Sequence, residues 1–144
     1  LIGEKTAAAV KIAVGNVMPG TFMEVNVRGR DLVTGLPREV VVTDSDIREA
    51  ISGSIANLVD GIKEVLETTP PEILSDVMHR GIILAGGGAL IQGLDVLLAN
   101  VLKLPIYIAD DPLSAVARGT GVVFEDIDYF KDVLLKSNDE LPLR

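Results

Sequence analysis

Residues 82–95, IILAGGGALIQGLD, contain the pattern that decides the fold. The apolar run at residues 82–84 predicts a strand that is covered on both faces. Gly86, Gly87 and Gly88 follow it directly, and helical spacing of apolar residues predicts a helix from about Ala89. Glycine carries no side chain, so a ligand can touch the backbone, and the positive end of a following helix attracts phosphate. A plain tight turn is the alternative, because the segment matches neither a P-loop nor the GxGxxG fingerprint.

The residues that follow continue an α/β pattern. Residues 105–109 (PIYIA) predict a second short buried strand, and a further helix is expected to begin at Asp110-Asp111-Pro112 and to run past Val123. A strand, a helix and a second strand in this order predict a parallel pair with a right-handed crossover. Asp110 and Asp111 are candidates for a metal-binding pair, but their position before a proline favours a helix cap.

The first third of the chain predicts a different, α+β arrangement. A helix is expected at residues 3–14, followed by antiparallel strands at residues 21–28 and 39–43. The turn-rich connector between the strands has a basic cluster, Arg28, Arg30 and Arg38. We expect this cluster to be solvated or to contact a neighbouring subunit.

A long amphipathic helix is predicted to join the two parts. Its caps are expected at residues 44–46, and its apolar stripe, which we expect to be core, runs from Ile47 to Leu66. Pro70 and Pro71 end it and open a short helix. The single histidine, His79, falls at the end of that short helix, where a surface or capping role is expected rather than catalysis.

Composition excludes several classes of function. The chain has 144 residues, no cysteine and a formal net charge of −8. This charge argues against nucleic acid as a partner, and the missing cysteines exclude a disulfide framework and a cysteine–zinc site. No apolar run reaches the length of a membrane span. The chain starts with Leu1 rather than Met, which predicts an excerpt of a longer protein.

Five segments together resemble the MreB family of bacterial actins, which organise rod shape. Besides IILAGGGALIQGLD they are IGEKTAAAVKIAVGNVMPG, VRGRDLVTGLPREV, ETTPPEILSDVMHRGI and ADDPLSAVARGTG, and the similarity runs from residue 2 to about residue 121. The resemblance implies an α/β, actin-like ATPase lobe (ribonuclease-H-like) with a small inserted α+β subdomain. Residues 1–44 would be the outer subdomain of the second lobe, residues 45–125 its nucleotide-binding subdomain, and residues 126–144 a partly disordered tail.

The resemblance also implies an ATP site with Mg in the full-length protein. Gly86, Gly87, Gly88 and Ala89 match the loop that packs on the adenosine. The helix that meets the base and ribose from the other side is matched by Ala7, Ala8, Ala9, Val10 and Lys11. Two positions depart from the family pattern, because Ala8 replaces a common Glu and Ala85 replaces a common Thr. The phosphate loops and the catalytic acid have no counterpart here, so the chain alone is expected not to hydrolyse ATP.

The function implied is that of a cytoskeletal ATPase. It would form filaments at the inner, cytoplasmic face of the cell membrane and work with other cell-shape and cell-wall synthesis proteins. The alternatives are a lobe of a non-polymerising actin-superfamily ATPase or sugar kinase, or a scaffold without activity in isolation.

Overall fold

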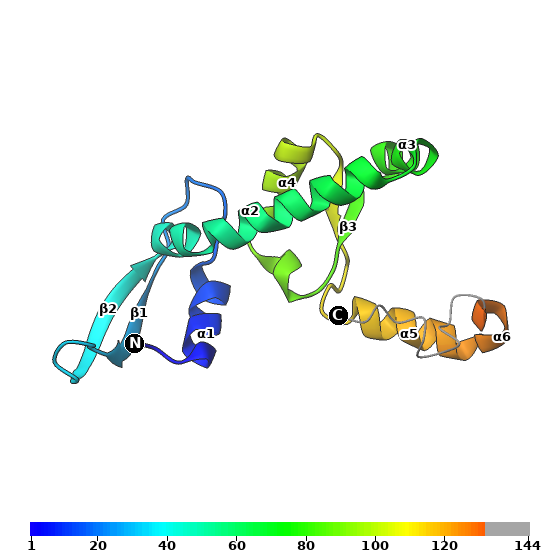
Figure 1. The fold of residues 1–144 in the computed structure, drawn as a ribbon. Helices are drawn as coiled ribbons and strands as arrows, with labels where there is room; N and C mark the ends of the chain where they lie inside the picture. Colours follow the sequence, from blue (N-terminus) through cyan, green and yellow to red (C-terminus); the bar gives the residue numbers. More distant parts are fainter. Residues whose placement is uncertain (132–144) are drawn as a thin grey trace.

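The computed structural model describes residues 1–131 as an elongated molecule that is held together along one long helix (Figure 1). In chain order the elements are α1 (Glu4–Val14), β1 (Glu24–Arg30), β2 (Pro37–Thr43), α2 (Asp44–Thr68), α3 (Pro71–Arg80), β3 (Ile82–Leu84), the 3-10 helix η1 (Gly87–Leu90), α4 (Leu94–Leu102), β4 (Ile106–Ile108), α5 (Ala115–Glu125) and α6 (Ile127–Phe130). Residues 126–144 were expected to be a partly disordered tail, and residues 132–144 of it lie outside the described residues.

The strands β1 and β2 form an antiparallel hairpin, as the alternation of apolar residues predicted. The pairing runs from Glu24 opposite Thr43 to Arg30 opposite Pro37. Val27 is buried, and it packs with Val10 and Val14 of α1. Helix α1 therefore covers one face of the hairpin, and this pair of elements makes the first of two small apolar cores.

The cap of helix α2 lies one residue earlier than the first cap expected from the sequence. The cap is Thr43: its Oγ1 accepts from the Asp46 amide at 3.3 Å, and Asp46 Oδ2 accepts from the Thr43 amide at 2.8 Å. This reciprocal capping box satisfies two backbone donors that the helix leaves free. The hydrogen bond from the Thr43 backbone is the main cause that lowers the pKa of Asp46 below its ordinary value.

The strands β3 and β4 form a parallel pair, with Ile82 opposite Ile106 and Leu84 opposite Ile108. Helices α2 and α4 pack on one face of this pair, where the second core contains Val17, Val59, Leu94 and Leu98. The other face is open, because Ile83 and its partner Tyr107 are 69% and 54% exposed. The prediction that the strand at residues 82–84 is covered on both faces is therefore wrong for the described residues.

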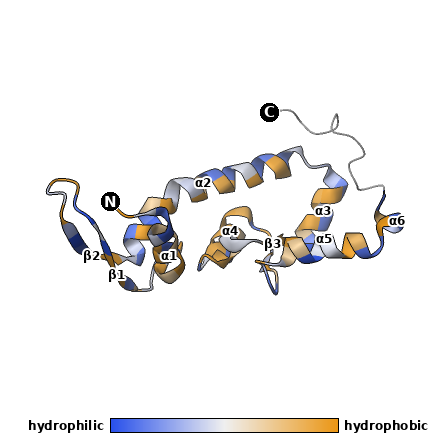
Figure 2. Ribbon diagram, turned by 90° about the horizontal axis from the view of Figure 1, so that it is seen from below, coloured by the Kyte–Doolittle hydropathy of each residue, from blue (hydrophilic) through white to orange (hydrophobic). Residues whose placement is uncertain are grey.

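The apolar stripe of α2 is also only partly covered. Val59 is buried and Ile51, Ile55 and Ile62 pack against the second core, whereas Leu58 and Val65 are 43% and 64% exposed. Figure 2 shows the alternation of hydrophobic and hydrophilic residues along this helix. The stripe is thus core over part of its length, and its remaining apolar surface is open among residues 1–131.

None of the helices in the described part of the chain combines the length and the apolar character that crossing a bilayer requires.

The second core predicts a large difference between two substitutions in α4. Leu98 is fully buried, whereas Val96 is 47% exposed. Leu98→Ala in the intact protein should lower the free energy of unfolding by about 2–5 kcal/mol, because a cavity is added to the lost transfer energy. The control Val96→Ala should cost less than about 1 kcal/mol. Urea denaturation measures both, and equal losses would contradict the packing described for α4.

Candidate functional site

The glycine turn after β3 has a different local structure from the predicted one. Gly86 has a φ of +81°, which favours glycine, and its amide donates to the Pro112 carbonyl at 2.6 Å. The residues that follow form the 3-10 helix η1, and the regular helix α4 starts only at Leu94. The start expected at about Ala89 is therefore wrong, because the backbone at Gly93 is left-handed, with a φ of +76°, and α-helix begins only after it. The N-terminus of α4 is therefore at Leu94 and not at the glycine turn.

The backbone of the glycine turn is accessible from outside. A Cβ added at Gly86 or Gly88 would meet no atom within 4 Å, and one at Gly87 would meet only Leu113 Cδ2, at 3.5 Å. Ala89, in contrast, is 3% exposed, so its methyl group packs inward. The three glycines thus present a peptide surface without side chains, on which a flat group can lie. The methyl group of Ala89 packs on the inner side of this surface.

The predicted residues of α1 divide between two faces of the helix. Ala7, Ala8 and Lys11 are exposed and share one face, since residues three and four apart are neighbours on a helix. Val10 is 6% exposed and belongs to the core with the hairpin. Ala9 is exposed, but it lines a groove between α1 and β1. The structure therefore gives Val10 a packing role and leaves Ala7, Ala8 and Lys11 as the residues that a ligand can reach from the other face.

The backbone links the end of α1 to the segment after the glycine turn. The Val17 amide donates to the Gln92 carbonyl at 3.0 Å, and Asn16 forms a β-bridge with Gln92. Gly93 has a φ of +76°, and a Cβ there would lie 2.6 Å from Met18 Cγ. Figure 1 places α1 and the turn after β3 on the same side of α2. The two predicted halves of the site, α1 and the glycine turn, are thus joined by backbone contacts just after α1 and a few residues after the turn.

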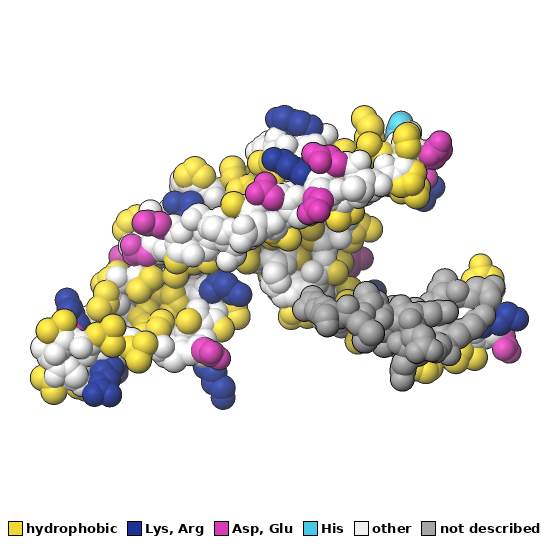
Figure 3. Space-filling view, viewed as in Figure 1, with side chains coloured by type: hydrophobic (Ala, Val, Ile, Leu, Met, Phe, Trp, Pro, Cys, Tyr) yellow, Lys and Arg dark blue, Asp and Glu magenta, His cyan; other side chains and the backbone are white. Residues whose placement is uncertain are grey.

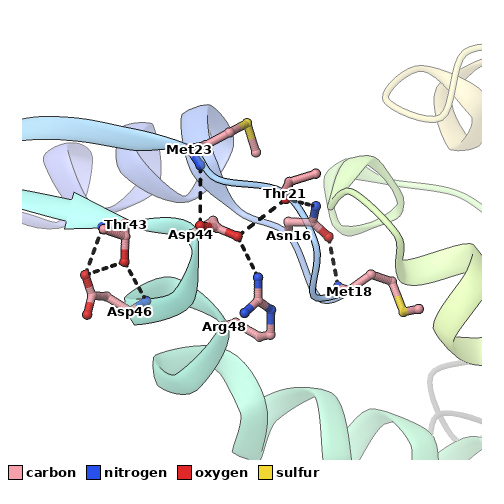
Figure 4. Close-up of polar contacts among 8 residues, drawn as sticks. All are labelled: Asn16, Met18, Thr21, Met23, Thr43, Asp44, Asp46 and Arg48. Atoms are coloured by element: carbon pink, nitrogen blue, oxygen red, sulfur yellow. Dashed lines mark hydrogen bonds and ion pairs between the residues drawn. The ribbon is translucent and has the colours of Figure 1, made fainter.

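Sequence reasoning missed the residues that make this link. From the sequence, Asn16 is expected only to end the helix at residues 3–14, and Asp44 only to cap the long helix. Both are buried, at 5% and 3% exposed, and they belong to a polar cluster between α1 and α2 (Figure 4). The available signal was weak: a polar residue next to a helix end is usually exposed, and only the tertiary structure buries these two.

The remaining candidates have structural roles. His79 is exposed, with Nδ1 2.8 Å from the Ser75 carbonyl oxygen, in agreement with the predicted surface position. Asp111 accepts hydrogen bonds from the Ser114 hydroxyl and amide, just before α5 begins at Ala115. The Ser114 hydroxyl is the main cause that lowers the pKa of Asp111 below its ordinary value. Within residues 1–131, no three His, Asp or Glu side chains are grouped to hold a metal ion.

The basic cluster of the hairpin is largely neutralised within the hairpin itself. Arg28 Nε lies 3.4 Å from Glu39 Oε2, and Arg38 Nη1 lies 3.0 Å from Asp31 Oδ2. The tip between them is apolar, because Leu32 and Val33 are 78% and 95% exposed. Figure 2 shows this hydrophobic tip, and Figure 3 shows hydrophobic side chains beside Lys and Arg at the hairpin end.

Comparison with known proteins connects these features to a family. The family model described as MreB/Mbl protein matches residues 1–132. The cell shape-determining protein Mbl of Bacillus cereus is 51% identical over 129 residues, and MreB of Escherichia coli is 43% identical over the same length. These alignments cover 89% of this chain but only 39% and 37% of the two relatives. The chain therefore spans about two fifths of the length of the curated relatives that it matches.

Solved structures agree with the sequence comparison. The crystal structure of MreB5 of Spiroplasma citri bound to ADP matches with a TM-score of 0.84 and 36% identity over 91% of this chain and 40% of that one. The same protein bound to AMPPNP matches equally well, with a TM-score of 0.84 over 92% of this chain. The α/β, actin-like fold expected from the resemblance is thus confirmed, and the chain belongs to the MreB/Mbl family of cell shape-determining proteins.

Proposed function

We propose that this chain is the C-terminal part of an actin-like cytoskeletal ATPase that binds ATP between two lobes and polymerises into filaments. The filaments would lie at the inner face of the cell membrane and act with cell-wall synthesis proteins to set rod shape. Two findings support the proposal: the relatives are named as cell shape-determining proteins, and the Spiroplasma citri homologue binds ADP and AMPPNP. Residues 1–44 would form the outer subdomain and residues 45–125 the nucleotide-binding one.

The observation that carries the nucleotide site is the open peptide surface at Gly86, Gly87 and Gly88. Adenine is flat and mainly apolar, and it needs close approach on both faces to be buried. The bare turn would contact it on one side, with Ala89 as the anchor beneath. The exposed face of α1, with Ala7, Ala8 and Lys11, would approach from the other side, and the Lys11 ammonium group can donate hydrogen bonds to ribose or phosphate oxygens.

The packing residues of α1 would support this site indirectly. Val10 holds α1 against the hairpin and Ala9 lines the groove beside it, so Val10 would set the position of the exposed face. Ala8 has no polar atom on its side chain, so α1 holds the ribose without a carboxylate at this position. Magnesium, when bound with ATP, would neutralise phosphate charge. The acidic side chains of residues 1–131 form no cage for it, so its ligands would come from the rest of the protein and the phosphates.

A single substitution tests this placement. In Gly87→Val, the new side chain would project into the space above the turn, where only Leu113 is near. The fold should persist, while ADP affinity of the intact protein should fall at least about tenfold, because adenine loses its close approach. Titration calorimetry measures the affinity. Gly53→Val in α2, where a Cβ meets nothing within 4 Å, is the control. Unchanged ADP affinity in Gly87→Val would contradict the placement of the adenine on the glycine turn.

For self-association we propose that the hairpin tip contacts the next subunit. If the basic cluster at Arg28, Arg30 and Arg38 contacts a neighbouring subunit, as one of the two expectations from the sequence has it, its charge would attract the acidic surface of that subunit. The ion pairs Arg28–Glu39 and Arg38–Asp31 reduce that attraction, whereas Leu32 and Val33 offer apolar surface that a neighbour can bury. Since the tip lies at one end of an elongated molecule, its contact with a different surface would repeat without closing.

The apolar tip can be tested by assembly. Leu32→Ser combined with Val33→Ser in the intact protein should raise the critical concentration for ATP-dependent sedimentation several-fold, because two exposed apolar groups no longer become buried. Val41→Ser, which removes a half-exposed valine from β2 away from the tip, should change it little. If the double variant and the native protein sediment equally, with circular dichroism unchanged, the proposal that the hairpin tip contacts the next subunit is wrong.

A further inference from the structure

Two buried polar side chains lie where the connector between α1 and β1 meets the first turn of α2. Among residues 1–131, Asn16 and Asp44 are the polar side chains that are buried, at 5% and 3% exposed. Burying polar groups is costly unless their hydrogen bonds are satisfied. These two residues lie at the same junction, and their partners connect them to one another (Figure 4).

The contacts form one continuous relay. Asn16 Nδ2 donates to Thr21 Oγ1 at 2.8 Å, and the Thr21 hydroxyl donates to Asp44 Oδ2 at 3.4 Å. The same Asp44 oxygen accepts from Arg48 Nη2 at 2.6 Å, and Asp44 Oδ1 accepts from the Met23 amide at 3.4 Å. The Thr21 hydroxyl is thus the one group that joins the Asn16 end of the relay to the Asp44 end.

The two ends of the relay reach different parts of the molecule. At one end, Asn16 Oδ1 accepts from the Met18 amide at 2.8 Å and so fixes the turn that presents Val17 to Gln92. At the other end, the Asp44 amide donates to the Met23 carbonyl at 2.9 Å, where the hairpin leaves the connector and α2 begins. The connector is therefore held both to the segment after the glycine turn and to the first turn of α2.

This arrangement determines where α1 lies. The helix ends at Val14, two residues before Asn16, and Lys11 is about one helical turn further back. Gly86–Gly88 are only a few residues before Gln92 along the chain. Any shift of the connector against Gln92 would therefore change the separation between the exposed face of α1 and the glycine turn.

We propose that Thr21, Asn16 and Asp44 are positioning residues for the nucleotide site, with Thr21 as the joint between the other two. The inference rests on the proposed nucleotide function. It adds that residues which do not contact the nucleotide affect the affinity for it. None of the three needs to touch the ligand. The relay keeps α1 and the glycine turn at the separation that binds adenosine. Without it, a smaller fraction of molecules is ready to bind, and the apparent affinity falls by that fraction.

Thr21→Val tests the role of the Thr21 hydroxyl, because valine has the shape of threonine without the hydroxyl. We expect the intact protein carrying Thr21→Val to bind ADP about three- to tenfold more weakly, the scale of one hydrogen bond. Thr21→Ser, which restores the hydroxyl, should regain most of the native affinity. Thr120→Val, which removes a hydroxyl bonded to the Val116 carbonyl within α5, loses a comparable hydrogen bond and should leave ADP affinity unchanged.

Hydrogen–deuterium exchange of the native protein provides a test that needs no variant. Saturating ADP should slow exchange at the amides of Val17 and Met18, because the ligand favours the arrangement that the relay holds. If Thr21→Val folds and binds ADP as the native protein does, or if ADP leaves the exchange of both amides unchanged, the relay has no positioning role, while the proposed site stands. A native protein that binds no ADP would overturn the proposed function, and this inference with it.

Discussion

The contact between the connector after α1 and the segment after the glycine turn is the constraint on which the rest of the molecule depends. Val17 and Gln92 are 75 residues apart in the chain, and one backbone hydrogen bond at 3.0 Å joins them. The approach requires glycine at residue 93, where the backbone is left-handed and Met18 occupies the space that a side chain would need. It brings the α+β part of the chain to the α/β part without a large shared core.

This constraint explains why the molecule has two small cores rather than one. Val10, Val14 and Val27 make one core between α1 and the hairpin, and the other lies where α2 and α4 cover β3 and β4. Between them lie polar groups, and polar contacts fix direction more than they add stability. The polar contacts would thus fix how the two packed parts are oriented, and the proposed nucleotide site lies where these parts meet.

Local patterns predicted most of the elements, because periodicity and breakers act over a few residues. The hairpin, α2, α3 and the parallel pair all occur where alternation, helical spacing and the prolines indicated them. The errors have a common physical cause, which is competition between neighbouring residues of similar propensity. Thr43 outcompetes the three polar residues after it as the cap of α2, and Ala89 and Leu90 belong to a 3-10 helix where α-helix was expected.

Burial was predicted less well, because it depends on contacts between distant segments. Ile83 belongs to an apolar run that is typical of a covered strand, yet the described residues leave it 69% exposed. No local pattern marks Asn16 and Asp44 as buried, and the fold leaves them only 5% and 3% exposed. For the candidate site, the resemblance indicated both the glycine turn and α1. Only the structure separated Ala7, Ala8 and Lys11 from the buried Val10 and from Ala9, which lines the groove beside β1.

The most direct test of the account is a crystal structure of the intact protein with ADP. We expect the adenine ring to lie within about 4 Å of the backbone of Gly87 and Gly88, the distance of van der Waals contact. The exposed face of α1 with Lys11 should lie on the other side of the nucleoside. ADP bound elsewhere, with the three glycines open to solvent, would contradict the central claim.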